Sequence, residues 1–214
     1  MSKLIYRLLI VALSITGLVA QMYPNKFYNL TYYTTQSSII VMLFFAYTAY
    51  LMFSRQFERL HGSNFLRLKG GITIMIALTF LVYAILLAPQ ASPEDFHTIN
   101  NYTLHYIVPV MVILDWLVLD KGWHYRAIEP LTWAIVPIVY LIFSLIKGYI
   151  LRIPIPEAKH SPYPYFFLNV DKSGWQTVLT YILVIAIFYI VSGYLMLAVK
   201  KMQTTFTQRP YIKK

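Results

Sequence analysis

The sequence has no cysteine and little charge. Of its 214 residues only 12% are charged, whereas soluble domains average about 25%. Without cysteine, the chain can form no disulfide, no thiolate nucleophile and no Cys-ligated metal site. With 58% hydrophobic residues, it cannot cover a water-facing surface. These features predict a protein that lies in a lipid bilayer.

Six long apolar runs account for most of this hydrophobicity. Because a helix needs about 20 apolar residues to cross the hydrocarbon core, each run can cross it once. The predicted spans are Leu4–Met22, Thr34–Phe53, Gly70–Leu87, Tyr102–Leu119, Leu131–Lys147 and Trp175–Val199. We therefore expect an all-α fold, a six-transmembrane-helix bundle that forms a single domain over residues 1–214.

The first run follows Lys3 and Arg7 and so has the outline of a signal peptide. Cleavage after Ala20 would require a small residue where Leu18 stands, and we expect a retained helix.

The formal net charge of +10 comes from cations in the segments that flank the apolar runs. Most of the 18 lysine and arginine residues lie on the side of the N-terminus. Cytoplasmic segments carry such an excess, so we expect both termini inside. The same placement favours contact with anionic lipids over nucleic acid, and it makes Ser54–Lys69 a basic cytoplasmic clamp on lipid headgroups. The absence of cysteine fits the bacterial inner membrane, where we expect the protein. The oligomeric state is left open.

The longest connection, Gly148–Gly174, is rich in proline and aromatic residues. Its prolines oppose a regular helix, and its aromatics are too apolar for a free linker, so we expect an interfacial or re-entrant flap over the outer mouth. Its segment Tyr163–Phe167 would cover an acyl chain. Aromatic side chains gather on this outer side, and the candidates for a substrate pocket are Tyr33, Tyr106, Tyr163, Tyr165 and Phe166.

Thr34 begins the second span, at the outer side of the membrane. As a helix N-cap, its side chain would satisfy free backbone N–H groups. Alternatively, its hydroxyl could act as a nucleophile, because the same N–H groups and the helix dipole favour a developing oxyanion. The side-chain candidates for stabilising or orienting such a site are Gln36, Ser38, Asn101 and Tyr102.

His105 lies at a similar depth, at the start of the fourth span. It could be a hydrogen-bonded interfacial anchor or the base for a Thr34 nucleophile. Pro109 removes the helical hydrogen bond to its carbonyl and should kink the chain there. His105, Val108, Val112 and Asp115 share one face, so we expect the imidazole to point into the bundle.

Asp115 lies about 15 Å further along this helix, too far to orient His105. An intramembrane carboxylate needs a partner, and Arg7 lies at a comparable depth. We expect a structural Asp115–Arg7 pair, with a proton-relay aspartate as the alternative.

Metal and retinal sites are not expected. His97, His105 and His160 fall on the outer side, but none has a His or Glu partner at i+3 or i+4, and no HExxH motif occurs. Lys147 lies near a helix end, so a mid-membrane Schiff-base lysine is missing. We expect no cofactor.

Three segments, YYTTQSSIIV, LHYIVPVMVILDW and SPYPYFFLNV, resemble the androgen-induced-protein family in order and spacing. The likeness is greatest to its bacterial six-span relatives. Eukaryotic members are integral-membrane threonine hydrolases that split fatty acid esters of hydroxy fatty acids. The resemblance implies Thr34 as nucleophile, with Thr35 one step away as the other possible match, and His105 as base. Where eukaryotic members carry a second histidine, this chain has Tyr102, preceded by Asn101.

The expected function is therefore that of an intramembrane lipid ester hydrolase whose partners are the bilayer and a fatty-acyl ester. The alternative is a non-enzymatic lipid-binding receptor or small transporter with the same cavity. The enzyme requires a dead-end pocket in which Thr34 and His105 are in contact. The alternative predicts a cavity that continues past Asp115 and a Thr34 side chain that caps its helix.

Overall fold

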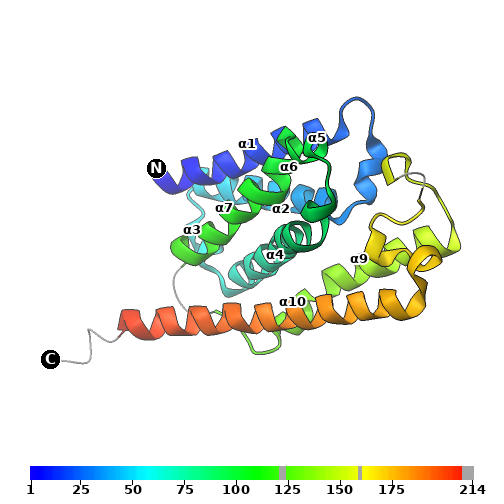
Figure 1. Ribbon diagram of the computed structural model, residues 1–214. Coiled ribbons are helices and arrows are strands. Elements are labelled where there is room, and N and C mark those ends of the chain that lie inside the picture. Colours follow the sequence, from blue (N-terminus) through cyan, green and yellow to red (C-terminus); the bar gives the residue numbers. More distant parts are fainter. Residues whose placement is uncertain (121–123, 159–160, 209–214) are drawn as a thin grey trace.

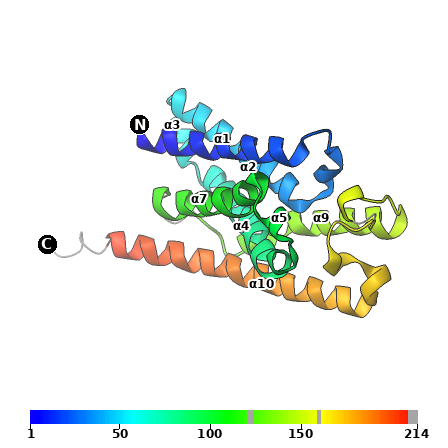
Figure 2. The same cartoon turned by 45° about the horizontal axis from the view of Figure 1, so that its top comes forward.

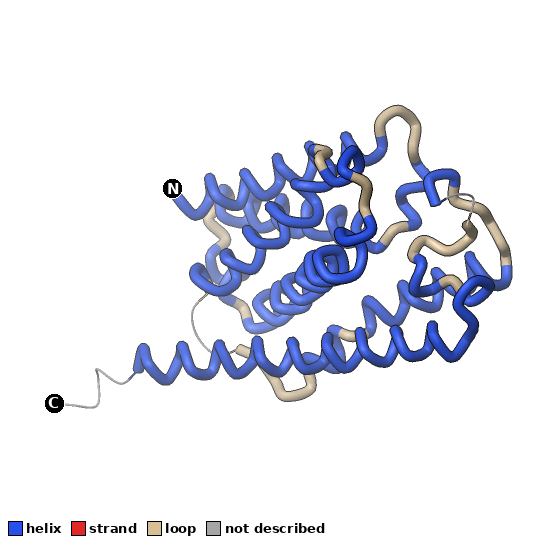
Figure 3. The backbone as a smooth tube through the Cα atoms, in the orientation of Figure 1, coloured by secondary structure: helices blue, strands red, loops and turns tan. Residues whose placement is uncertain are grey.

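The computed structural model describes residues 1–120, 124–158 and 161–208, and within these ranges every regular element is helical (Figure 3). His160 lies outside the described residues. Six segments are long and apolar enough to cross a membrane: Ser2–Met22, Tyr33–Phe53, Ser63–Gln90, Ile99–Leu119, Glu129–Ile150 and Val170–Thr205. The protein is thus an all-α integral membrane protein with six transmembrane helices.

The first three spans and their connections consist of α1 (Ser2–Met22), η1 (Phe27–Thr31), α2 (Tyr33–Phe53), α3 (Phe57–His61), α4 (Ser63–Val82), η2 (Tyr83–Leu87) and η3 (Ala88–Gln90). In the fourth span and the segment before it lie α5 (Pro93–Phe96), α6 (Ile99–Asn101), η4 (Tyr102–Ile107), α7 (Val108–Leu114) and η5 (Asp115–Leu119). The last two spans comprise α8 (Glu129–Trp133), α9 (Ile135–Leu145), η6 (Ile146–Ile150), η7 (Pro156–Ala158), η8 (Phe166–Leu168) and α10 (Val170–Gln208).

The six observed spans coincide with the six expected ones, apart from shifts at their ends. The largest shift is in the third span, which begins at Ser63 instead of Gly70. The expectation that the connection between the two spans runs from Ser54 to Lys69 is therefore wrong from Ser63 on. Lys69 is only 1% exposed, because its position on α4 directs its side chain to the buried carboxylates of Asp115 and Asp120.

Figures 1 and 2 show the helices in the same order from one side of the bundle to the other. α1 lies on one side, α4 and α7 occupy the middle, and α10 forms the opposite side. The start of α1 and the end of α10 lie at the same end, which we call the inner end in keeping with its expected cytoplasmic location (Figure 1). The described residues between η6 and α10 lie over the other, outer end (Figure 1).

Gly17 brings α1 against η4, the segment that carries His105. A Cβ at residue 17 would lie 2.5 Å from Leu104 Cδ2 and would also overlap Thr103 Oγ1. Small residues let membrane helices approach closely. This contact therefore holds η4, and with it His105, at a set distance from α1.

A buried ion cluster near the inner end joins α1, α4 and η5 with Asp120, the residue that follows η5. Arg7 Nε donates to Asp115 Oδ1 at 3.0 Å, so the two residues that the sequence suggested as a pair lie in contact. Lys69 also contacts Asp115 and donates to Asp120 Oδ1 at 2.6 Å. The four side chains are at most 9% exposed, so they neutralise one another away from water.

Lys200 closes the same region from α10. Its Nζ donates to the carbonyls of Trp116, at 2.6 Å, and Asp120, at 2.9 Å. These carbonyls belong to the end of the fourth span, where the helix no longer supplies partners. Lys200 thus ties α10 to the end of η5.

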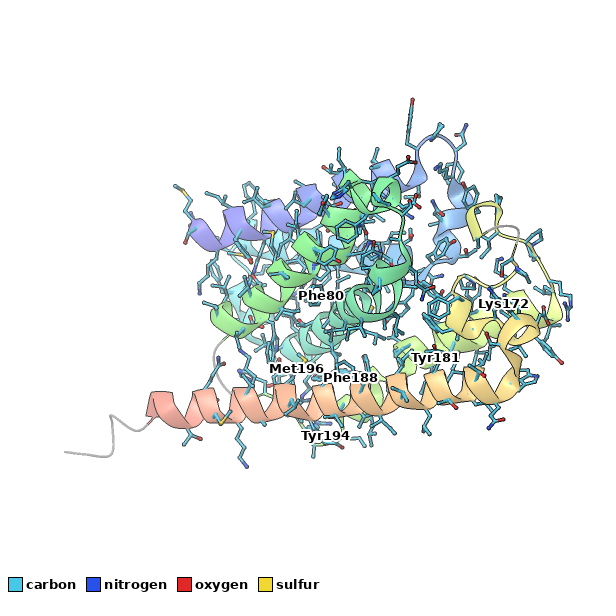
Figure 4. The ribbon with its side chains drawn as sticks, viewed as in Figure 1. Phe80, Lys172, Tyr181, Phe188, Tyr194 and Met196 are labelled. Atoms are coloured by element: carbon cyan, nitrogen blue, oxygen red, sulfur yellow. The ribbon has the colours of Figure 1, made fainter. Side chains whose placement is uncertain are left out.

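On the outer side of Lys200, Gly193 of α10 lies close to α8. A Cβ there would lie 2.8 Å from Pro130 Cβ. Figure 4 shows Met196 on the side of α10 that faces the bundle and Tyr194 on the side that faces away. Towards the outer end, a cavity separates α10 from α2 and α4.

Candidate functional site

Thr34 lies in the first turn of α2 at the outer end of the bundle. Its Oγ1 is 3.2 Å from His105 Nε2, within hydrogen-bonding distance. The N-cap position of α2 belongs to Tyr32, and no side chain caps it. The Thr34 side chain therefore faces another helix instead of capping its own, and only 8% of the residue is exposed.

The hydroxyls next to Thr34 along α2 have other environments. Thr35 Oγ1 and Ser38 Oγ are buried without a hydrogen-bond partner in the described part of the chain. Ser37 Oγ donates to the Thr34 carbonyl at 3.1 Å and lies 2.9 Å from Thr79 Oγ1. Of the two adjacent threonines, it is thus Thr34 whose hydroxyl contacts the imidazole.

His105 lies in the π-helical segment η4, just before Pro109 in α7. Proline has no N–H for the His105 carbonyl, and a π turn pairs a carbonyl with the residue five positions later. The helix irregularity that Pro109 was expected to cause is therefore observed as the π-helical segment η4. On the same face, Val108, Val112 and Asp115 are completely buried.

Tyr83 supports the His105 ring from η2. The two rings are stacked, with centroids 3.8 Å apart and 26° between their planes. Asn101 interacts with the Tyr83 side chain and donates its amide to the Phe96 carbonyl at 2.7 Å. His105 Nδ1 is buried near the Asn101 backbone without a hydrogen bond of good geometry. Asn101 and Tyr83 thus form a chain of contacts behind the imidazole.

A cavity of about 330 Å³ adjoins Thr34. None of the described residues that line it is charged. Its wall on α10 runs from Ile182 to Ile190, which is about 12 Å at 1.5 Å per residue. Below it, the Gly193–Pro130 contact brings α10 onto α8. Ile138 lines the cavity and is 51% exposed, so the cavity is open to the lipid on one side.

Only some of the expected pocket residues line this cavity. Tyr33 and Tyr165 do, and Phe167 takes the place expected for Phe166. Tyr163 is 1% exposed and packs its ring against Gly148, outside the lining. Tyr106 also lies outside it and contacts the Phe80 ring edge to face, with centroids 5.9 Å apart.

Two of the expected orienting side chains are engaged elsewhere. Gln36 Nε2 donates to the Leu30 carbonyl at 2.9 Å. The Tyr102 hydroxyl lies 2.6 Å from His97 Nδ1 on an exposed surface. The structure therefore brings together Thr34 and His105. The Asn101 side chain reaches the pair only through Tyr83, and Gln36 and Tyr102 do not reach it.

Sequence reasoning missed Tyr83, Tyr140 and Tyr189 as neighbours of the site. All three line the cavity. Each lies within or beside a long apolar run, where a tyrosine at one position gives no signal of its direction. Within the described residues, no group of three His, Cys, Asp or Glu side chains could hold a metal ion.

The Tyr165 hydroxyl meets the start of α2 from the segment before α10. It accepts the Tyr33 backbone N–H at 3.0 Å. Burial raises the pKa of the Tyr165 phenol above its usual value of 10, while hydrogen bonds with Thr34, Tyr33 and Tyr140 act in the opposite direction. This phenol therefore keeps its proton at neutral pH.

A hydroxyl, an imidazole and a protonated phenol thus meet at the wall of an apolar cavity. Such a set can carry out nucleophilic chemistry on an apolar substrate. Comparisons with models of known families, with curated proteins and with solved structures found no match to the chain.

Proposed function

We propose that the protein is an intramembrane lipid ester hydrolase with Thr34 as nucleophile and His105 as base. The observation that carries the proposal is the 3.2 Å contact between Thr34 Oγ1 and His105 Nε2 at the wall of an apolar cavity. A secondary hydroxyl is a weak nucleophile until a base removes its proton, and this distance allows direct transfer.

In the proposed reaction, Thr34 Oγ attacks the ester carbonyl carbon while its proton passes to His105 Nε2. This requires the imidazole tautomer with its proton on Nδ1. When the tetrahedral intermediate collapses, His105 returns the proton to the departing alkoxide and leaves acyl-Thr34. Water then attacks the acyl group and gives its proton to His105, and the proton passes back to Thr34 as the free acid leaves.

The substrate class follows from the lining of the cavity. An uncharged, mostly apolar wall favours an acyl chain and disfavours a buried carboxylate. The opening beside Ile138 would admit a lipid directly from the bilayer. Fatty acid esters of hydroxy fatty acids, which the resemblance to the androgen-induced-protein family implies, fit this description, with the free carboxylate outside the cavity. We place the activity in a bacterial inner membrane.

The rival function is lipid binding or transport without chemistry. A transporter needs a path towards the inner end, whereas neither Asp115 nor any other described residue of α7 or η5 lines the cavity. A cap role for Thr34, which the rival also requires, is opposed by the direction of its side chain. Both observations favour the hydrolase.

Fluorophosphonate labelling of the purified protein in detergent tests the proposal. Wild type should be labelled, and both Thr34→Ala and His105→Ala should lose labelling. Thr35→Ala is the matched control, since it removes the adjacent hydroxyl, which has no partner among the described residues, and should leave labelling intact. A folded wild type that resists labelling and does not hydrolyse an acyl ester would support the lipid-binding function instead.

A further inference from the structure

Tyr165 lies where the backbone donors of α2 were expected to act. Its hydroxyl accepts the Tyr33 N–H at 3.0 Å, although 132 positions separate the two residues in the chain. It also interacts with the side chain and backbone of Thr34. The Tyr33 N–H, one of the N–H groups at the start of α2 that were expected to stabilise an oxyanion, is therefore already hydrogen-bonded to the Tyr165 oxygen.

Aromatic neighbours hold this ring on several sides. Phe167 is stacked on it, with centroids 5.1 Å apart and 5° between the planes. Tyr32 meets it edge to face at 5.7 Å. Tyr165 is 9% exposed, so the hydroxyl is directed at the start of α2 by close packing. The Tyr165 hydroxyl thus has a restricted position, as a preorganised donor requires.

The proton of this hydroxyl has two acceptors in reach. Its side-chain hydrogen-bonding neighbours are Thr34 and Tyr140. Tyr140 donates its own proton to the Thr31 carbonyl at 3.0 Å, so the Tyr140 oxygen can only accept. The Tyr165 proton can therefore point at the Tyr140 oxygen in the resting site and turn from it to a substrate oxygen that enters beside Thr34.

We propose that Tyr165 is a catalytic residue whose O–H donates a hydrogen bond to the oxyanion formed when Thr34 attacks the ester. This inference rests on the proposed function and adds the donor that it lacked. Tyr165 makes and breaks no covalent bond, and its proton stays on the phenol oxygen. The N–H that it accepts, at the positive end of the α2 dipole, polarises the O–H and strengthens it as a donor.

Tyr165→Phe tests the proposal because it removes only the hydroxyl. Loss of one oxyanion donor lowers kcat about 10²- to 10³-fold, and we expect this fall with little change in KM for a chromogenic acyl ester. Tyr163→Phe is the matched control, since it removes a buried hydroxyl that belongs to the same segment but lies outside the cavity lining. It should behave as wild type.

Replacing Tyr165 with a ring-fluorinated tyrosine gives a second readout that does not depend on removing the oxygen. Fluorination lowers the pKa of the phenol while keeping its shape and its contact with Tyr33. The donor must be protonated to act, so activity should be lost at a lower alkaline pH than in wild type. An unchanged alkaline limit would overturn the proposal, because a packing role does not depend on the phenol proton.

The outcomes separate this proposal from the proposed function. If wild type and Tyr163→Phe neither hydrolyse the ester nor label, the hydrolase itself is wrong. If wild type is active and Tyr165→Phe retains kcat within about twofold of the control, Tyr165 is no oxyanion donor while the hydrolase stands. A fall in kcat for Tyr165→Phe alone supports the proposal.

Discussion

The Tyr83 ring stacks on the His105 imidazole with a centroid separation of 3.8 Å, from a π-helical segment that faces another one. Because His105 Nδ1 has no well-formed hydrogen bond in the described chain, this stack is the main side-chain contact that sets the ring plane. In the proposed hydrolase, an aromatic ring therefore takes the place of the carboxylate that usually orients the histidine beside a nucleophilic hydroxyl.

Tyr83→Leu should therefore slow the reaction without removing any reacting group. An aromatic pair contributes about 0.5–1.5 kcal/mol beyond its buried area, so the rate of fluorophosphonate labelling should fall up to about tenfold. Tyr83→Phe keeps the ring and should label at nearly the wild-type rate. Equal labelling of the Leu and Phe variants would show that the stack does not orient His105.

The buried ion cluster at the inner end leads to a prediction on stability. Asp115→Asn would leave Arg7 and Lys69 with Asp120 as the carboxylate that faces them. Breaking a buried ion pair by removing one partner costs about 3–5 kcal/mol, so thermal unfolding in detergent should shift to a clearly lower temperature. Arg7→Met should cost less, because Lys69 and Lys200 are still two cations beside the two carboxylates of Asp115 and Asp120.

The Asp115→Asn variant also tests the alternative role of Asp115 as a proton relay. Asp115 lies ten residues after His105, about 15 Å along the helix. We expect Asp115→Asn to label at Thr34 at temperatures where it remains folded. A well-folded variant without labelling would instead assign Asp115 to the chemistry.

Much of the fold could be predicted from the sequence because a bilayer imposes simple requirements. Apolar runs of sufficient length become spans, and the structure has all six of them. The depth of Thr34 and His105 followed from their places at the ends of two such runs, and their side chains lie 3.2 Å apart. The depth of a residue in the membrane depends on its position along a span, so the hydropathy pattern of the sequence is enough to predict it.

Direction around a helix or within a loop was harder to predict. Lys69 was expected among the headgroups because its charge marks the inner side, but tertiary contact with Asp115 and Asp120 turns it inward. In the segment before α10, Phe167 instead of Phe166 faces the cavity. Tyr165, Phe166 and Phe167 are consecutive in the sequence, so they have no periodicity from which the direction of each side chain can be inferred.

The inner part of the cavity should limit the length of the acyl chain that it accepts. Ala134 and Leu131 line it at the α8–α9 junction, near the Gly193–Pro130 contact. Ala134→Phe would fill this part while leaving the space beside Thr34 open. We expect hydrolysis of long-chain chromogenic esters to fall about tenfold or more, as overpacking of about 1–3 kcal/mol implies, with little change for a short-chain ester.

Ile135→Phe is the matched control, because Ile135 is 58% exposed and absent from the cavity lining. It adds an aromatic ring at the next position but on the lipid side, and it should leave both rates unchanged. The ratio of long-chain to short-chain kcat/KM is the deciding quantity, since it cancels differences in the amount of folded enzyme. An unchanged ratio in Ala134→Phe would mean that the acyl chain lies outside this cavity, along the lipid-facing opening beside Ile138.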